Sequence, residues 1–171
     1  EKIRQAQDMD TIFLNVLPSL RKQLQCDRLA VFRFHPDWSV EFVAESVKDK
    51  WLSLADSDIK TIWMDEYLQE TQGGRYRNHE TTVVNDIYTV GYVQCYLEIL
   101  EKIQAKAYAV APIFIGNKLW GFIGAYQNTG PREWKSKDVQ LLRKVAVQMG
   151  IGLQQVKYIE QLKNKNAELA R

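Results

Sequence analysis

Two neighbouring segments rich in β-forming residues, AKAYAVAPIFI (105–115) and LWGFIGAYQN (119–128), are separated only by the residues Gly-Asn-Lys. The pair Gly116–Asn117 is a strong signal for a tight turn between antiparallel strands. The pattern therefore predicts a β-hairpin. Any fold proposed for this chain has to contain an antiparallel sheet.

Three further segments are expected to join this sheet. CDRLAVFRF (26–34) alternates apolar and charged residues and is expected to end near Pro36, and WSVEFVAESV (38–47) is a second strand after a short turn. TTVV (81–84) is a short strand.

Helical periodicity marks both ends of the chain. An apolar stripe runs from Ile3 to Leu24, where Pro18 is expected to kink the helix or split it in two. A longer helix is expected from an N-cap at Ser136 to the end of the chain. The element order predicts an α+β fold, with a central antiparallel sheet flanked by helices and with the terminal helices packed together on one face.

Composition restricts the function. The chain has 171 residues, enough for one domain, and its formal charge of +2 gives no argument for nucleic acid or for an anionic membrane. It has no apolar run near the length of a membrane span and no signal-peptide pattern.

Cys26 and Cys95 form no CxxC or Cys/His cluster, so a reducing cytosol is expected and a metal site is not. Phosphate-binding loops and nucleophile–base pairs are also absent from the sequence, so an enzyme is not expected.

Cys95 lies on a predicted helix over 91–104 that is apolar on two sides. Leu97 and Leu100 share one side, whereas Cys95 has Tyr92 and Ile99 as its neighbours on the other. One hydrophobic core accounts for one side only, so the second side needs a partner or an apolar ligand. The alternative is that Cys95 is a small buried hydrophobe, as unpaired cysteines often are.

Residues that suit a flat ligand with carboxylates lie just before this helix. Trp63 and Asp65 are two residues apart, and Arg75 and Tyr76 follow a pair of glycines that lets the backbone approach another group closely. Arginine holds carboxylates well. A structural interpretation is open for each residue: Asp65 as a helix N-cap, Arg75 as a surface ion-pair partner and the aromatic residues as core.

Several motifs taken together resemble the bilin-binding GAF domain of cyanobacteriochromes, in particular the red/green group found in PixJ-type phototaxis receptors. They are DRLAVFRFHPDWSVEFVAESV, LQETQGGRYRN, VVNDIYTVGYVQCYLEIL, KAYAVAPIFIGNKLWGFIGAYQN and REW. The resemblance covers about residues 10–160. It implies a GAF fold in which a linear tetrapyrrole lies between the sheet and the 65–104 segment, for light-dependent signalling such as phototaxis.

The resemblance also implies roles for single residues. Cys95 matches the cysteine that forms a thioether to ring A, and Asp65 matches the carboxylate that accepts hydrogen bonds from the pyrrole nitrogens. Trp63 matches the aromatic residue that stacks on ring D, at whose bridge the bilin isomerises. Arg75 matches a propionate-binding position, and Tyr76 belongs to the ring environment.

Four positions depart from the pattern of the red/green group. Tyr96 replaces the histidine that usually follows the anchoring cysteine, and Tyr67, Thr82 and Val110 replace a histidine, a larger aromatic residue and an isoleucine. Members with Tyr after the cysteine include those that accept biliverdin. Biliverdin IXα with far-red/orange photoswitching is therefore the first prediction, and phycocyanobilin with red/green photoswitching is the alternative. The second cysteine of the blue- and green-sensing branches is missing from WLSLADSDIKTIW (51–63).

The expected organisation is an N-terminal helix over 1–25, a bilin-binding GAF domain over 26–156 and a linker helix over 157–171 that leads to an output domain. The resemblance implies a cytoplasmic domain of a longer receptor, and it leaves open whether that receptor is bound to a membrane. Homodimerisation through the terminal helices is open as well. Two other functions remain: a GAF domain that binds a small molecule such as a cyclic nucleotide, and a dimerisation module without pigment.

Overall fold

A computed structural model describes residues 2–56 and 66–170. Its centre is a five-stranded sheet with the order β2-β1-β5-β4-β3, in which every neighbouring pair is antiparallel. The strands are β1 (Arg28–Phe34), β2 (Val40–Val47), β3 (Thr82–Val84), β4 (Ala107–Ile115) and β5 (Lys118–Gln127). The predicted hairpins β1–β2 and β4–β5 are both confirmed.

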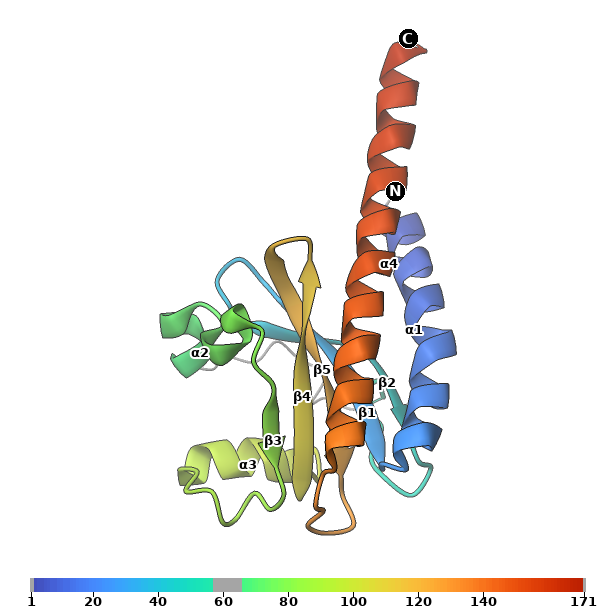
Figure 1. The fold of residues 1–171 in the computed structure, drawn as a ribbon. Helices are drawn as coiled ribbons and strands as arrows, with labels where there is room; N and C mark the ends of the chain where they lie inside the picture. The colour runs from blue at the N-terminus through green and yellow to red at the C-terminus, as the bar shows by residue number, and fades with distance from the viewer. Residues whose placement is uncertain (1, 57–65, 171) are drawn as a thin grey trace.

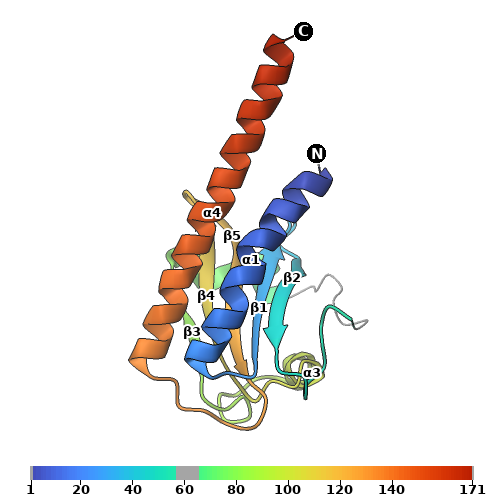
Figure 2. The same ribbon diagram turned by 90° about the vertical axis from the view of Figure 1, so that its right-hand side faces the viewer.

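The two long helices cover one face of the sheet. α1 (Lys2–Leu24) and α4 (Ser136–Leu169) lie against each other and against that face, as Figures 1 and 2 show. The side chains buried between these layers include Phe13, Leu17, Leu20, Leu29, Val31, Ile113, Ile123, Leu142, Ala146, Met149 and Leu153. The predicted α+β architecture, with its terminal helices in contact, is therefore confirmed.

Shorter elements cover the opposite face (Figure 1). They are α2 (Glu66–Thr71), the 3₁₀ helix η1 (Gly74–Asn78) and α3 (Gln94–Lys102). α2 and η1 lie near one end of this face, and α3 lies near the other end. A second hydrophobic cluster, separate from the first, fills the space beneath them.

The prediction that Pro18 splits the first helix in two is wrong, because α1 runs through it as a single helix. A proline in a helix has no N–H to donate to the carbonyl four residues earlier, which here belongs to Leu14. Both Pro18 and Leu14 are on the exposed side of α1, with Leu14 70% exposed. Water can therefore bind the free carbonyl, while the buried stripe of the helix continues on the other side.

Two predicted helix starts also differ. The helix expected over 91–104 begins only at Gln94, because Gly91 has φ +82° and Val93 is extended. The N-cap of α4 is Lys135, one residue before the predicted Ser136. Its backbone N–H donates to the Asp138 carboxylate at 3.2 Å, which fixes the start of the helix there.

The last part of α4 extends beyond the sheet (Figure 1), and none of the residues 154–170 is buried. Its exposed apolar side chains include Tyr158, Ile159, Leu162 and Leu169. In the part of the chain that the structure describes, no helix combines the length and the apolar character needed to cross a membrane.

Candidate functional site

The sheet face opposite α1 and α4 is lined by aromatic side chains, of which five are tyrosines. We call this surface the tyrosine face and define it by Tyr76, Tyr92, Tyr96, Tyr108, Tyr126 and Phe122. Tyr108 and Tyr126 are buried and come from the two strands β4 and β5. The others are partly buried and include residues of η1, α3 and the loop before α3.

Cys95 lies at the α3 end of the tyrosine face. It is the second residue of α3 and is exposed, whereas its neighbour Tyr96 is partly buried against the second hydrophobic cluster. The rings of Tyr92 and Tyr96 lie 4.7 Å apart between centroids, and the hydroxyl groups of Tyr92 and Tyr108 share a hydrogen bond. Cys95 is therefore exposed to solvent on the helix that brings Tyr96 to the tyrosine face.

The tyrosine face has a low polarity in its centre. Burial raises the pKa of Tyr108 far above its usual value, and the nearby Tyr96 and Tyr92 raise it further. Burial likewise raises the pKa of Tyr126, with contributions from Tyr76 and Tyr96. These phenols remain neutral, so they offer hydroxyl hydrogen bonds and flat apolar surface rather than charge.

The η1 end of the face brings together three of the predicted site residues. The Tyr76 hydroxyl and Thr82 Oγ1 lie 2.9 Å apart and share a hydrogen bond. Thr82 is paired with Val110 across the β3–β4 ladder. The ring of Tyr76 stacks on Phe122, with centroids 5.7 Å apart and planes 19° from parallel. Sequence positions 76, 82 and 110 thus meet at one place.

Two glycines shape the turn that holds Tyr76 there. Gly73 and Gly74 have φ values of +101° and +55°, which favour glycine. A Cβ atom on Gly74 would lie 2.6 Å from the ring of Tyr67, so this tyrosine of α2 covers the second glycine. Tyr67 itself is 55% exposed, and Arg75 is exposed on η1.

The remaining candidates, Trp63 and Asp65, lie outside the residues that the structure describes. Tyr108, Tyr126 and Phe122 were not among the predicted site residues. Strand periodicity could have identified them, because Tyr108 and the predicted Val110 are two residues apart on one strand and so share a face. In the described ranges 2–56 and 66–170, no three His, Cys, Asp or Glu side chains gather as a metal site would require.

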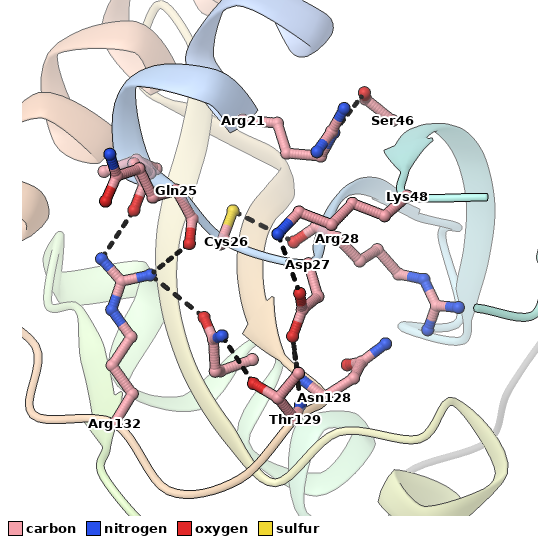
Figure 3. A network of polar contacts seen from close by, with 12 residues as sticks. Arg21, Gln25, Cys26, Asp27, Arg28, Ser46, Lys48, Asn128, Thr129 and Arg132 are labelled. Carbon is pink, nitrogen blue, oxygen red and sulfur yellow. Dashed lines mark hydrogen bonds and ion pairs between the residues drawn. The ribbon is translucent and has the colours of Figure 1, made fainter. Parts of the chain in front are cut away.

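Cys26 is completely buried, and its thiol contacts the backbone oxygen of Arg28 at 3.5 Å (Figure 3). Burial raises the pKa of the Cys26 thiol to about 11, although Arg132 and Arg21 oppose the shift. The thiolate is the reactive form of cysteine. Cys26 is therefore protected both by its position and by its protonation.

We expect the two thiols to react very differently. With a water-soluble aromatic disulfide at pH 8, the folded chain should release one equivalent of reporter thiolate, from Cys95. The unfolded chain should release two. Two fast equivalents from the folded chain would contradict the burial of Cys26, and none would contradict the exposure of Cys95.

Comparison with known proteins gives a consistent result. The GAF domain family matches residues 8–153. The red light-absorbing state of NpR6012g4, a red/green cyanobacteriochrome, is 51% identical, with a TM-score of 0.83 and coverage of 89% of this chain and 97% of that chain. The far-red absorbing dark state of JSC1_58120g3 with bound biliverdin IXa is 36% identical, with a TM-score of 0.80 and coverage of 92% of this chain and 96% of that chain.

A curated relative is the putative methyl-accepting chemotaxis protein sll0041 of Synechocystis sp.. It is 29% identical over 168 residues, which are 98% of this chain but 16% of the relative. The chain thus spans about a sixth of the length of this relative.

Proposed function

The chain belongs to the GAF domains of the cyanobacteriochromes, and we propose that it holds a linear tetrapyrrole on the tyrosine face, covalently attached through Cys95. The observation that carries this proposal is the 51% identity to a red/green cyanobacteriochrome of which the chain covers 97%. By family the chain is a photoreceptor module and not an enzyme.

The described residues fit such a pigment. A thioether needs a thiol that a reagent can reach from solvent, and Cys95 is exposed at the edge of the tyrosine face. The stacked rings of Tyr76 and Phe122 and the neutral, buried Tyr108 suit a flat conjugated molecule. The exposed guanidinium of Arg75, on the same side of the sheet, suits a propionate carboxylate.

The roles of the other residues follow from the family resemblance. We assign Asp65 to the pyrrole nitrogens, where a carboxylate favours the protonated, cationic pigment. Trp63 is assigned to ring D. The pigment supplies light absorption and isomerisation at the ring D bridge. Tyr67, Thr82, Tyr96 and Val110 shape the space around it, and the hydrogen bond between Tyr76 and Thr82 fixes one part of that wall.

Red/green photoswitching is better supported than far-red/orange photoswitching, which was the first prediction from the sequence. Of the two structures described above, the red/green cyanobacteriochrome is 51% identical to this chain, whereas the structure with bound biliverdin is 36% identical. We therefore place phycocyanobilin first. Biliverdin IXα remains the second candidate, because Tyr96, Thr82 and Val110 depart from the red/green pattern and the biliverdin-bound structure is a true relative at 36% identity.

Co-production of the chain with each bilin separately tests this choice. We expect a protein with phycocyanobilin attached that interconverts between red- and green-absorbing states. The attached pigment is identified after unfolding in acid, by its absorbance against free phycocyanobilin and biliverdin. Attachment of biliverdin alone would restore the far-red prediction and contradict the preference for phycocyanobilin.

A signal from the pigment would leave the domain through α4. This helix packs on β4, and its last part extends past the sheet. We propose residues 26–156 as the pigment-binding unit and 157–171 as a link to an output domain, in keeping with a relative about six times as long. A colourless chain in the presence of both bilins would instead favour a small-molecule GAF domain or a dimerisation module.

A further inference from the structure

A completely buried arginine, Arg28, begins β1. A guanidinium stays charged at any physiological pH, and a buried charge is tolerated only when it is paired and hydrogen-bonded. The partners of Arg28 therefore show which parts of the fold it holds together.

Arg28 bridges two segments that are far apart in the sequence. Its Nη1 donates to the carbonyl oxygen of Ile103, the C-cap residue directly after α3, and its Nη2 donates to the carbonyl oxygen of Leu52. The last carbonyls of a helix have no partner within the helix, and a cation is favourable at that end. Arg28 thus caps α3 at its C-terminal end and holds the 51–56 segment against it.

Glu45 of β2 completes the arrangement. Its Oε2 lies 3.5 Å from Nε of Arg28, and only 5% of its side chain is exposed. Its other oxygen accepts hydrogen bonds from Ser53 Oγ at 2.8 Å and from the Ala55 N–H at 3.2 Å. The carboxylate that pairs with Arg28 is therefore also hydrogen-bonded to the 51–56 segment.

A further hydrogen bond joins this segment to the end of α3 directly. The Leu52 N–H donates to Gln104 Oε1 at 2.9 Å. The 51–56 segment and the end of α3 therefore form one hydrogen-bonded unit, with Arg28 at its centre.

Both segments of this unit continue into residues of the proposed pigment site. Cys95 precedes Ile103 by eight residues, about 12 Å along a helix. In the other direction the chain runs from residue 56 directly into 57–65, which contains Trp63 and Asp65. A helix of this length moves as one body, so fixing its last turn also fixes the position of its first.

We propose that Arg28, paired with Glu45, is a positioning residue of the pigment site: it fixes the helix that carries Cys95 and the 51–56 segment as one unit. The inference rests on the proposed function. It assigns no contact between Arg28 and the pigment.

Arg132 provides a matched control. Like Arg28 it donates to two backbone carbonyls, those of Leu24 at 2.6 Å and Gln25 at 3.3 Å, and it pairs with a carboxylate, Asp138, at 3.4 Å. Figure 3 shows Arg28 and Arg132 on opposite sides of Asp27. Arg132 joins the end of α1 to the start of α4, so its loss should disturb the fold without disturbing the pigment site.

The test compares Arg28→Lys, Arg28→Met and Arg132→Met with the unmutated chain. Lysine keeps a charge for Glu45 but cannot reach both carbonyls with a rigid fork, so Arg28→Lys remains informative if Arg28→Met does not fold. Two quantities are measured: the rate of thioether formation with added phycocyanobilin, and the amide hydrogen exchange of residues 51–56 and 94–105 in the chain without pigment.

We expect Arg28→Lys to slow attachment about tenfold, the size of effect that loss of one hydrogen bond to a charged group produces. Exchange should rise in both segments together. Arg132→Met should leave attachment and both segments unchanged while lowering the melting temperature. Normal attachment in both Arg28 variants, or an equal effect of Arg132→Met, would overturn the proposal. If the unmutated chain attaches no bilin, the proposed function fails. The amide hydrogen exchange still decides whether Arg28 couples the two segments: exchange in the Arg28 variants should rise in both segments if Arg28 couples them, and in only one or neither if it does not.

Discussion

Replacing Cys95 by alanine should remove all covalently bound pigment. When the variant is co-produced with a bilin and run on a denaturing gel containing zinc, the fluorescent band of the unmutated chain should be lost. The reason is geometric as well as chemical. Cys95 is the exposed thiol at the edge of the tyrosine face, and no other cysteine lies within reach of that surface, because the second one is buried in the opposite core.

Cys26→Ala is the matched control. Its side chain packs among the residues between the sheet and the long helices, and its substitution should leave the fluorescent band in place at a small cost in stability. A Cys95→Ala variant that is coloured while folded still agrees with this assignment, because pigment held without a covalent bond is released on the denaturing gel. A fluorescent band that survives in Cys95→Ala, or vanishes in Cys26→Ala, would contradict the assignment of the anchor.

Replacing Gly150 by alanine should destabilise the fold strongly. A Cβ atom at this position would lie 2.0 Å from the carbonyl oxygen of Phe114, so α4 and β4 would have to move apart. Overpacking typically costs about 1–3 kcal/mol, and we expect about 2 kcal/mol at Gly150. In a domain of this size the melting temperature should fall by roughly 4–8 °C, measurable by circular dichroism.

Gly152→Ala, two residues further along the same helix, is the control. The nearest atom to a Cβ there is Ile12 Cδ1 at 3.4 Å, an ordinary contact with the end of a flexible side chain. Alanine favours a helix over glycine by roughly 0.5–1 kcal/mol, so this variant should be as stable as the original chain or slightly more stable. Equal destabilisation by both substitutions would show that general helix disturbance, not the contact with Phe114, is responsible.

The sheet was predictable because its signals are local. The turn at Gly116–Asn117 and the alternation in β1 each lie within a few residues, and both hairpins form where the sequence indicates them. The error at Pro18 has a different cause. Whether a proline breaks a helix depends on which side of the helix faces water, and that is decided by how α1 packs on the sheet and on α4.

The same distinction holds for the site. Tyr76 and Cys95 could be proposed from the sequence, because the motifs that contain them resemble those of a known family. The contacts that surround them could not. The hydrogen bond between Tyr76 and Thr82 and the one between Tyr92 and Tyr108 each join different elements of the fold, so they depend on how those elements pack. Arg28 shows this most clearly, because its partners Leu52 and Ile103 are distant in the sequence.

The most direct test of the account is a light-induced difference spectrum of the purified chain with pigment attached at Cys95. Illumination at the absorption maximum should convert the pigment to a second form with a shifted band, and illumination of that form should restore the first spectrum through a shared isosbestic point. A chain that stays colourless with both bilins available would contradict the account. A chain that carries the pigment but shows no reversible shift would contradict its photoswitching function.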